Sequence, residues 1–272
     1  MKLISLCPSN TELLAYLDLI PSLIGVDDYS DWPEEIQHLP KLGPDLSIDM
    51  DKVEKLKPDL VLASLTVPGM EKNIEELEKR NIPYVIVPNP KTLSSVGEQL
   101  LFIGKETNTY ERAIVIYNKF HAIIEDYKAK SSQVGNVKTL YWEWWPKPVF
   151  TPGAANWLTE ISELAGGINI FKDYEDANVQ TDWEDVRKRN PDVISLVWVG
   201  VEKVKVNPSV LLKRPGWMEM DAIKTKQLYV LDEPYFCRPS PRLLIGLKKI
   251  AHILHPEIYP PFLEGKDPIL KA

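Results

Sequence analysis

The sequence predicts an α/β protein with two similar lobes, each built on a mostly parallel sheet, joined by one long helix. Three observations support this prediction. Short apolar runs alternate with helical patterns, thirty residues from 105 to 134 lack glycine and proline, and a segment of the first half recurs in the second. Strands that alternate with helices favour parallel sheets with covered faces. We expect a first lobe at 1–107, an interlobe helix at 108–132 and a second lobe at 133–272.

The long helix is predicted by the spacing of apolar residues between 110 and 130. They recur every three or four positions, as on one face of an amphipathic helix, at Ala113, Ile116, Phe120, Ile123 and Tyr127. Asn108 and Glu111 have the spacing of a capping box at its start. A helix over this range is about 30 Å long, enough to span a small domain.

The first half reads as strands and helices in alternation. An apolar run at 3–7 ends at Pro8, and a helical pattern follows in which Ser9 and Glu12 have capping-box spacing. Strands are predicted at 23–28, 58–64 and 83–88, with a helix at 69–81. The loop at 29–35 between these elements is rich in aromatic and acidic residues.

The second half repeats the pattern. Strands are predicted at 137–145, 192–200 and 227–233, and helices at 156–167 and 241–255. Residues from Asp45 align without gaps on those from Asn178, an offset of 178 − 45 = 133. Repeats of this length indicate two similarly folded lobes rather than a solenoid. The identical pairs are Asp49 and Asp182, Val53 and Val186, Lys55 and Lys188, Pro58 and Pro191, and Asp59 and Asp192.

Composition and motifs exclude several functions. A net charge of −7 argues against a nucleic-acid partner. No apolar run is long enough to cross a membrane. Two cysteines, Cys7 and Cys237, and four histidines form no metal-binding pattern. Nucleophile elbows, glycine-rich phosphate loops and zinc-protease motifs are absent, so no catalytic residue, metal site or catalytic cofactor is predicted, and we expect a protein that is not an enzyme.

Aromatic residues gather in loops that follow predicted strands. If the two lobes face each other, these loops converge on a cleft between them. Trp and Tyr suit a large, flat, partly apolar ligand, with a few polar groups fixing its orientation. The members are Tyr29 and Trp32 in the first lobe, and Trp144, Trp198, Tyr235 and Phe236 in the second. In the run at 141–145, strand alternation sends Trp142 and Trp144 to one face, and we favour Trp144 for the ligand.

Five motifs follow one another along the chain: LISLCPSNTELLAYLDL, GVDDYSDWP, KLKPDLVLAS, AGGINIF and DEPYFCRPSPRLLIGLKKI. Together they resemble the cobalamin-binding members of the cobalamin/siderophore class of substrate-binding proteins of ABC importers. The resemblance spans nearly the whole chain, in the family's motif order. It implies two α/β lobes, a rigid interlobe helix, and a shallow cleft that binds a corrinoid such as cobalamin and hands it to the importer's membrane subunits.

The resemblance also implies roles for single residues. Tyr29 matches the family's cleft tyrosine, and Arg238 matches an arginine four residues before Arg242 of the SPR motif. Glu71 and Glu219, which follow repeated Pro-Gly turns, match glutamates that dock onto the membrane subunits. The chain departs from the family pattern in three ways. A cleft tryptophan expected near Ser64 is replaced, cysteines stand at Cys7 and Cys237, and the family's leader segment is not seen in the sequence.

Two other functions, and the role of the two cysteines, stay open at this stage. The ligand could instead be haem or a ferric siderophore, although an anionic siderophore requires a basic cleft and the obvious cations are Arg238, Lys147 and Arg242. The chain could be a cytoplasmic corrinoid sensor or scavenger if Met1 is the native start, whereas the family resemblance implies an extracytoplasmic, monomeric protein. A thiol of Cys7 or Cys237 could approach a ligand metal, but a buried structural role is favoured.

Overall fold

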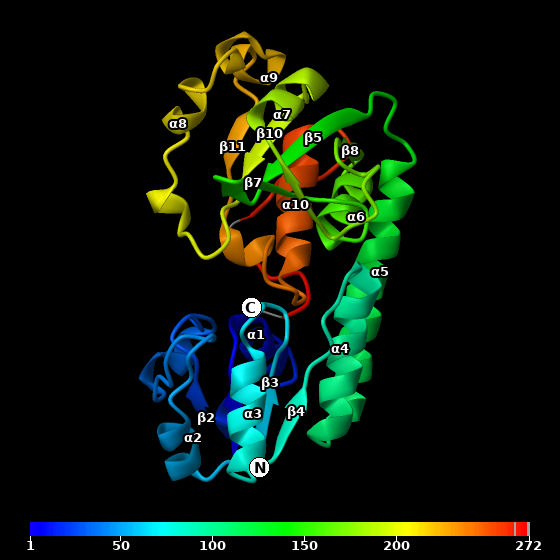
Figure 1. The fold of residues 1–272 in the computed structure, drawn as a ribbon. Coiled ribbons are helices and arrows are strands. Elements are labelled where there is room, and N and C mark those ends of the chain that lie inside the picture. Colours follow the sequence, from blue (N-terminus) through cyan, green and yellow to red (C-terminus); the bar gives the residue numbers. More distant parts are fainter. Residues whose placement is uncertain (264, 271–272) are drawn as a thin grey trace. The chain divides into compact units, whose positions relative to one another are not determined.

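The computed structural model describes residues 1–263 and 265–270. The chain forms two compact units, each with its own sheet (Figure 1). Unit 1 comprises residues 1–90, 94–121 and 239–241, and unit 2 comprises residues 91–93, 122–238 and those from 242 onward.

Unit 1 is built on a four-stranded parallel sheet with the order β2-β1-β3-β4. Because all four strands are parallel, the loops after them lie at one carboxyl edge, where ligands bind in open α/β sheets. The strands are β1 (Leu3–Ser5), β2 (Leu23–Val26), β3 (Leu60–Ala63) and β4 (Tyr84–Ile86). The helices are α1 (Pro8–Tyr16), α2 (Met50–Leu56), α3 (Glu71–Lys79) and α4 (Leu93–Glu106), with short 3-10 turns η1 (Ile20–Ser22) and η2 (Glu34–His38).

Unit 2 has a second four-stranded parallel sheet, ordered β11-β10-β5-β8, and a small antiparallel sheet, ordered β6-β7-β9. The strands are β5 (Lys138–Glu143), β6 (Trp145–Pro146), β7 (Val149–Pro152), β8 (Gly167–Asn169), β9 (Asn178–Thr181), β10 (Val193–Leu196) and β11 (Leu228–Val230). The helices are α6 (Trp157–Leu164), α7 (Trp183–Arg189), α8 (Ser209–Leu212), α9 (Asp221–Lys224) and α10 (Leu243–Leu254). The 3-10 turns are η3 (Lys203–Lys205), η4 (Trp217–Glu219) and η5 (Glu233–Tyr235).

The long helix is present as α5 (Tyr110–Ser131), and its predicted apolar face is buried at Ala113, Ile116, Phe120 and Tyr127. The predicted cap is wrong. Asn108 has a left-handed φ of 58° and closes the end of α4, because the amide of the next residue, Thr109, donates to the carbonyl of Gly104 at 2.8 Å.

The internal repeat corresponds to one structural unit used twice. The counterparts β1 and β5, β3 and β10, β4 and β11, and β2 and β8 occupy matching places in the two sheets. Asp49 and Asp182 are the N-caps of α2 and α7, each accepting a backbone N–H. These two helices end at Lys57 and Asn190, which both adopt the left-handed conformation.

Two aspartates at equivalent positions of the repeat, Asp59 and Asp192, make the same contact in each unit. Asp59 Oδ2 accepts from the backbone N–H of Lys2 at 2.6 Å, and Asp192 Oδ2 accepts from that of Thr139 at 2.8 Å. Each carboxylate therefore holds the strand that begins its lobe (β1 or β5) against the strand that it precedes (β3 or β10).

The first helix also starts differently from its prediction. Cys7 is the N-cap of α1 without a side-chain hydrogen bond, and Pro8 occupies the first turn. Proline suits this position because the first N–H groups of a helix have no intrahelical partner. Ser9 therefore lies inside the helix, and Glu12 accepts a hydrogen bond from the hydroxyl of Ser240, also in unit 1.

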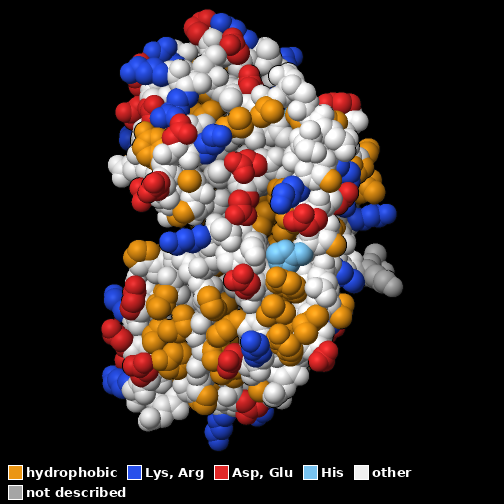
Figure 2. All heavy atoms as spheres, turned by 90° about the vertical axis from the view of Figure 1, so that its right-hand side faces the viewer, with side chains coloured by type: hydrophobic (Ala, Val, Ile, Leu, Met, Phe, Trp, Pro, Cys, Tyr) orange, Lys and Arg blue, Asp and Glu red, His pale blue; other side chains and the backbone are white. Residues whose placement is uncertain are grey.

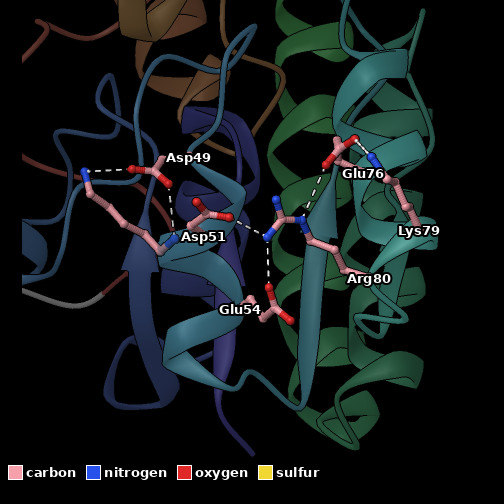
Figure 3. A network of polar contacts seen from close by, with 7 residues as sticks. Asp49, Asp51, Glu54, Glu76, Lys79 and Arg80 are labelled. Carbon is pink, nitrogen blue, oxygen red and sulfur yellow. Dashed lines mark hydrogen bonds and ion pairs between the residues drawn. The ribbon is translucent and has the colours of Figure 1, made fainter.

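Ion pairs join α2 to α3 on the surface of unit 1 (Figure 3). Arg80 Nη1 lies 2.6 Å from Asp51 Oδ1 and 2.8 Å from Glu54 Oε2, and its Nε lies 3.4 Å from Glu76 Oε2. One guanidinium thus bridges carboxylates of two helices, and because the carboxylates are solvated each pair contributes little to the stability of the fold.

Hydrophobic side chains gather on the face of unit 1 that Figure 2 turns toward the viewer. Exposed examples in this unit are Ile86 on β4 and Tyr110 and Val115 on α5. Among the described residues, no helix is long and apolar enough to cross a membrane.

Candidate ligand-binding site

The loop that presents Tyr29 is built on Asp27, the first residue after β2. Asp27 Oδ2 accepts from the backbone N–H groups of Tyr29 at 2.8 Å and Ser30 at 3.2 Å, and its other oxygen accepts the Ser30 hydroxyl. The ammonium of Lys41 donates to the backbone carbonyls of Asp27 and Ser30. These hydrogen bonds hold the backbone of the loop in place, while the Tyr29 side chain is 55% exposed and open to a ligand.

Asp27 is itself fully buried. Burial raises its pKa to about 6, against the lowering effect of the Ser30 and Tyr29 hydrogen bonds. Hydroxyls continue the polar contacts inward, since Thr11 Oγ1 on α1 lies 2.7 Å from Ser30 Oγ and 2.8 Å from Ser5 Oγ at the end of β1. The carboxyl edge of this sheet is thus an ordered polar layer beneath an exposed aromatic ring.

Trp32 lies in the same loop and is half-buried. Its ring packs against that of Tyr16 at the end of α1, with 5.8 Å between the ring centroids. Trp32 therefore supports the loop with one side of its ring.

In unit 2, the carboxyl edge is organised by a buried ion pair. Glu143, the last residue of β5, accepts two hydrogen bonds from Arg214, of 2.6 and 2.9 Å. It also accepts from Tyr141 Oη at 3.0 Å and Trp198 Nε1 at 3.2 Å. The Arg214 guanidinium lies 4.4 Å from the ring centroid of Trp217 and 4.9 Å from that of Trp183. This cluster joins the loops that follow β5 and β10.

Trp144 follows Glu143, and both its backbone N–H and its backbone carbonyl form hydrogen bonds. Its N–H donates to Phe150 of the β6–β7 hairpin, and its carbonyl accepts from Val199 at 3.1 Å. The side chain is 8% exposed, and its indole N–H has no partner among the described residues. Trp142, one pleat earlier, is fully buried and donates to Ser162, so it belongs to the core.

The segment after β11 supplies the remaining predicted residues. Arg238 Nε donates to Glu233 Oε2 at 3.1 Å, and the Arg242 guanidinium lies 4.9 Å from the ring centroid of Tyr235. Phe236 has no exposed surface and packs against Trp142 at 5.5 Å between ring centroids. We therefore assign Phe236 to the core beneath this segment, and Tyr235 and Arg238 to its more open side.

Neither cysteine is in a reactive environment. Burial raises the pKa of Cys7 to about 11 and that of Cys237 well above its ordinary value. Both thiols are therefore protonated at neutral pH and poor metal ligands, since the thiolate is the form that binds. Among the described residues, no group of three or more His, Cys, Asp or Glu is placed to hold a metal ion.

The two predicted docking glutamates are exposed but have different local roles. Glu71 opens α3, and the backbone N–H groups of Glu71 itself and of Gly69, the latter at 2.7 Å, donate to its carboxylate and lower its pKa. Glu219 ends the turn η4 and lies 3.3 Å from Lys224 Nζ. The Pro-Gly turns before them share a left-handed glycine, Gly69 and Gly216.

Comparison with known proteins identifies the family. Residues 3–235 match the model of the periplasmic binding protein family. The chain belongs to this family. It is 29% identical over 262 residues to the uncharacterised ABC transporter substrate-binding lipoprotein YvrC of Bacillus subtilis, covering 95% of this chain and 81% of that protein. It is 26% identical over 254 residues to the vitamin B12-binding protein of Vibrio cholerae, covering 93% and 88%.

A solved structure shows the same fold. The periplasmic haem-binding protein RhuT of Roseiflexus sp. RS-1 superimposes with a TM-score of 0.80 at 21% identity, covering 92% of this chain and 96% of that chain. The two-lobed α/β fold with parallel sheets is thereby confirmed. The chain is a substrate-binding protein of the ABC-importer class and, as predicted, not an enzyme.

Sequence reasoning missed Asp27 and Arg214. The signal for Asp27 was present, because an aspartate directly follows a buried strand and precedes Tyr29 by two residues. Arg214 had no such signal, since its partner Glu143 lies 71 residues away.

Proposed function

We propose that this protein binds a corrinoid of the cobalamin type and delivers it to an ABC importer. The similarity to vitamin B12-binding proteins over 93% of the chain is the observation that carries this proposal. The residues that we propose for ligand contact are Tyr29 and Trp32 of unit 1, and Trp144, Tyr235 and Arg238 of unit 2.

The charges around these residues support a neutral ligand. Arg238 is paired with Glu233, and both side chains are at least 87% buried. Arg242 is buried and stacked on Tyr235, while Asp27 contributes a buried carboxyl group. A corrin ring has apolar faces and a fringe of neutral amides, which needs aromatic walls and single donors rather than several cations.

Haem or a ferric siderophore is the second candidate, favoured by the fold shared with RhuT. Haem propionates and catecholate oxygens are anionic, and they require cations that are not already paired. The paired state of Arg238 therefore favours a corrinoid over these ligands.

Calorimetric titration with cyanocobalamin tests the proposal. We expect binding by the wild type and at least a tenfold loss of affinity for Tyr29→Ala, because the central aromatic residues of an interface typically contribute about 2 kcal/mol or more. The same direction is expected for Arg238→Ala. Tyr110→Ala removes another exposed tyrosine of unit 1, at the start of α5, and should leave the affinity unchanged.

Two results would change the assignment. If the wild type does not bind cyanocobalamin but binds haemin, the second candidate replaces the first. If cyanocobalamin binds and neither Tyr29→Ala nor Arg238→Ala weakens it, the ligand stands and these two residues do not contact it.

The same proposal includes the partner and the compartment. The relatives are named as periplasmic or lipoprotein binding proteins, so we place this chain outside the cytoplasm, where it meets the importer. Glu71 and Glu219 are both exposed, as docking onto cationic membrane subunits requires. We propose them as the docking residues and the protein as a monomer.

A further inference from the structure

Asp27 places a buried, ionisable carboxyl group in the proposed binding region, although the fold of the turn does not require one there. In unit 2, the counterpart strand β8 ends at Asn169, which is also fully buried and forms a turn of the same kind. Asn169 Oδ1 accepts from the backbone N–H of Phe171, two residues on, at 3.0 Å. Asp27 accepts from Tyr29, also two residues on, at 2.8 Å. The turn therefore needs a hydrogen-bond acceptor but not a negative charge.

Asn169 satisfies its remaining groups with neutral partners. Its amide N–H₂ donates to the carbonyl of Pro152 at 2.8 Å and to Thr159 Oγ1 at 2.7 Å. A neutral side chain in this environment avoids the desolvation penalty that burial imposes on an ion. Asp27, in contrast, forms no ion pair with any of the residues that the structure describes, and Lys41 bonds backbone carbonyls rather than its carboxylate.

The charged and titratable groups around Asp27 determine how readily it takes up a proton. Asp45 raises its pKa and Lys41 lowers it, both less than burial does. From α1, Cys7 faces it as a neutral thiol, and Glu12 is engaged by Ser240. Among the loop neighbours, Asp28 is turned away and accepts from the backbone N–H of Gly43 at 2.9 Å.

We propose that Asp27 is the positioning residue of the Tyr29 loop, and that closing this loop over a bound ligand is coupled to proton uptake by its carboxylate. The coupling follows from desolvation. When the loop opens, water reaches the carboxylate and its charged form is favoured. When the loop closes, and more so when a neutral ligand covers Tyr29, water is excluded and the protonated form is favoured. The ligand part of this proposal rests on the proposed function.

The protonated form keeps the loop intact. A neutral carboxyl group can still accept the N–H groups of Tyr29 and Ser30 on Oδ2 and donate from its other oxygen to Ser30 Oγ. The Ser30 hydroxyl then turns to Thr11, 2.7 Å away. Both protonation states therefore fit the closed loop, just as the neutral Asn169 fits the similar turn after β8.

The size of the effect follows from the pKa of about 6 for Asp27 in the closed, unliganded loop. If a ligand raises this pKa by one further unit, binding takes up about half a proton at pH 6.5, and affinity is about sixfold higher at pH 5.5 than at pH 7.5. If the open loop has an ordinary aspartate pKa, the amides of the closed loop are about tenfold better protected from exchange at pH 5 than at pH 7.5.

The first measurement is calorimetry with cyanocobalamin at pH 6.5 in buffers of different ionisation enthalpy. The wild type should take up a fraction of a proton, and Asp27→Asn should take up none while still binding. Asp27→Ala, which removes both acceptor oxygens, should bind more weakly at every pH. Asp27→Asn should therefore restore the affinity that Asp27→Ala loses, without restoring proton uptake. Asp28→Asn removes a neighbouring charge and should behave as the wild type does. Equal proton uptake by wild type and Asp27→Asn overturns the proposal.

The second measurement needs no ligand. Hydrogen exchange of the Tyr29 and Ser30 amides, corrected for the intrinsic pH dependence, should show protection that falls between pH 5 and pH 7.5 in the wild type and stays level in Asp27→Asn. A level wild-type profile overturns the proton coupling. If cyanocobalamin does not bind at all, the corrinoid function fails, and exchange still decides whether the loop is coupled to the proton.

Discussion

Removing Arg214 is expected to destabilise unit 2 more than any surface change. Its guanidinium makes two hydrogen bonds to Glu143 and lies between the rings of Trp183 and Trp217. The exposed fractions of the two charged side chains are 3% and 0%. Arg214→Met therefore leaves Glu143 as a buried charge held only by the donors on Tyr141 and Trp198.

Breaking such a buried pair from one side typically costs about 3–5 kcal/mol, because the remaining charge is desolvated without compensation. For a protein of this size, a loss of about 4 kcal/mol lowers the melting temperature by roughly 10 °C. Urea unfolding followed by tryptophan fluorescence measures the free energy, since three tryptophans lie within the cluster.

Two companion variants make the test specific. Arg187→Met breaks a solvated pair with Glu184 on α7 and should leave the unfolding free energy nearly unchanged. Glu143→Gln combined with Arg214→Met removes both charges and keeps an acceptor for Tyr141, so it should recover at least half of the loss. A loss below 1 kcal/mol for Arg214→Met, or a double variant no more stable than the single one, would refute this reasoning.

Three further predictions concern charge, docking and thiols. The pKa of Asp27 in the folded protein, about 6, exceeds its ordinary value of 3.8, so between these pH values the folded protein binds more protons than the unfolded chain. The contribution of Asp27 to the unfolding free energy should therefore fall by about 2–3 kcal/mol as pH rises from about 4 to 6. Unfolding free energies of Asp27→Asn, measured across this pH range, should lack this decrease. Glu71→Ala with Glu219→Ala should leave the unfolding free energy within about 1 kcal/mol while weakening transporter binding in a pull-down with reconstituted membrane subunits, and collapse of the fold would count against it. Visible spectra of bound cyanocobalamin should be the same for the wild type, Cys7→Ser and Cys237→Ser, and a shifted band would show that a thiol reaches the metal.

The sequence by itself determined the elements and the repeat, because these depend on neighbouring residues. The apolar spacing predicted an interlobe helix at 108–132, and α5 spans 110–131. Asp49 and Asp182 cap their helices through bonds to amides two or three residues away, so the repeat was readable as a pattern. Aromatic side chains after predicted strands indicated the proposed ligand-binding loops for the same local reason.

Only the tertiary structure decided which side chains are available and which charges are paired. Phe236 and Tyr235 are adjacent and both aromatic, yet Phe236 is sealed against Trp142 and Tyr235 is not. Ser9 is not the N-cap that the sequence predicted, because the helix begins at Pro8 and its N-cap is Cys7, two residues earlier. Burial and long-range pairing depend on residues far apart in the chain, as Glu143 and Arg214 are, and local sequence carries no record of the distance or dielectric that sets their energy.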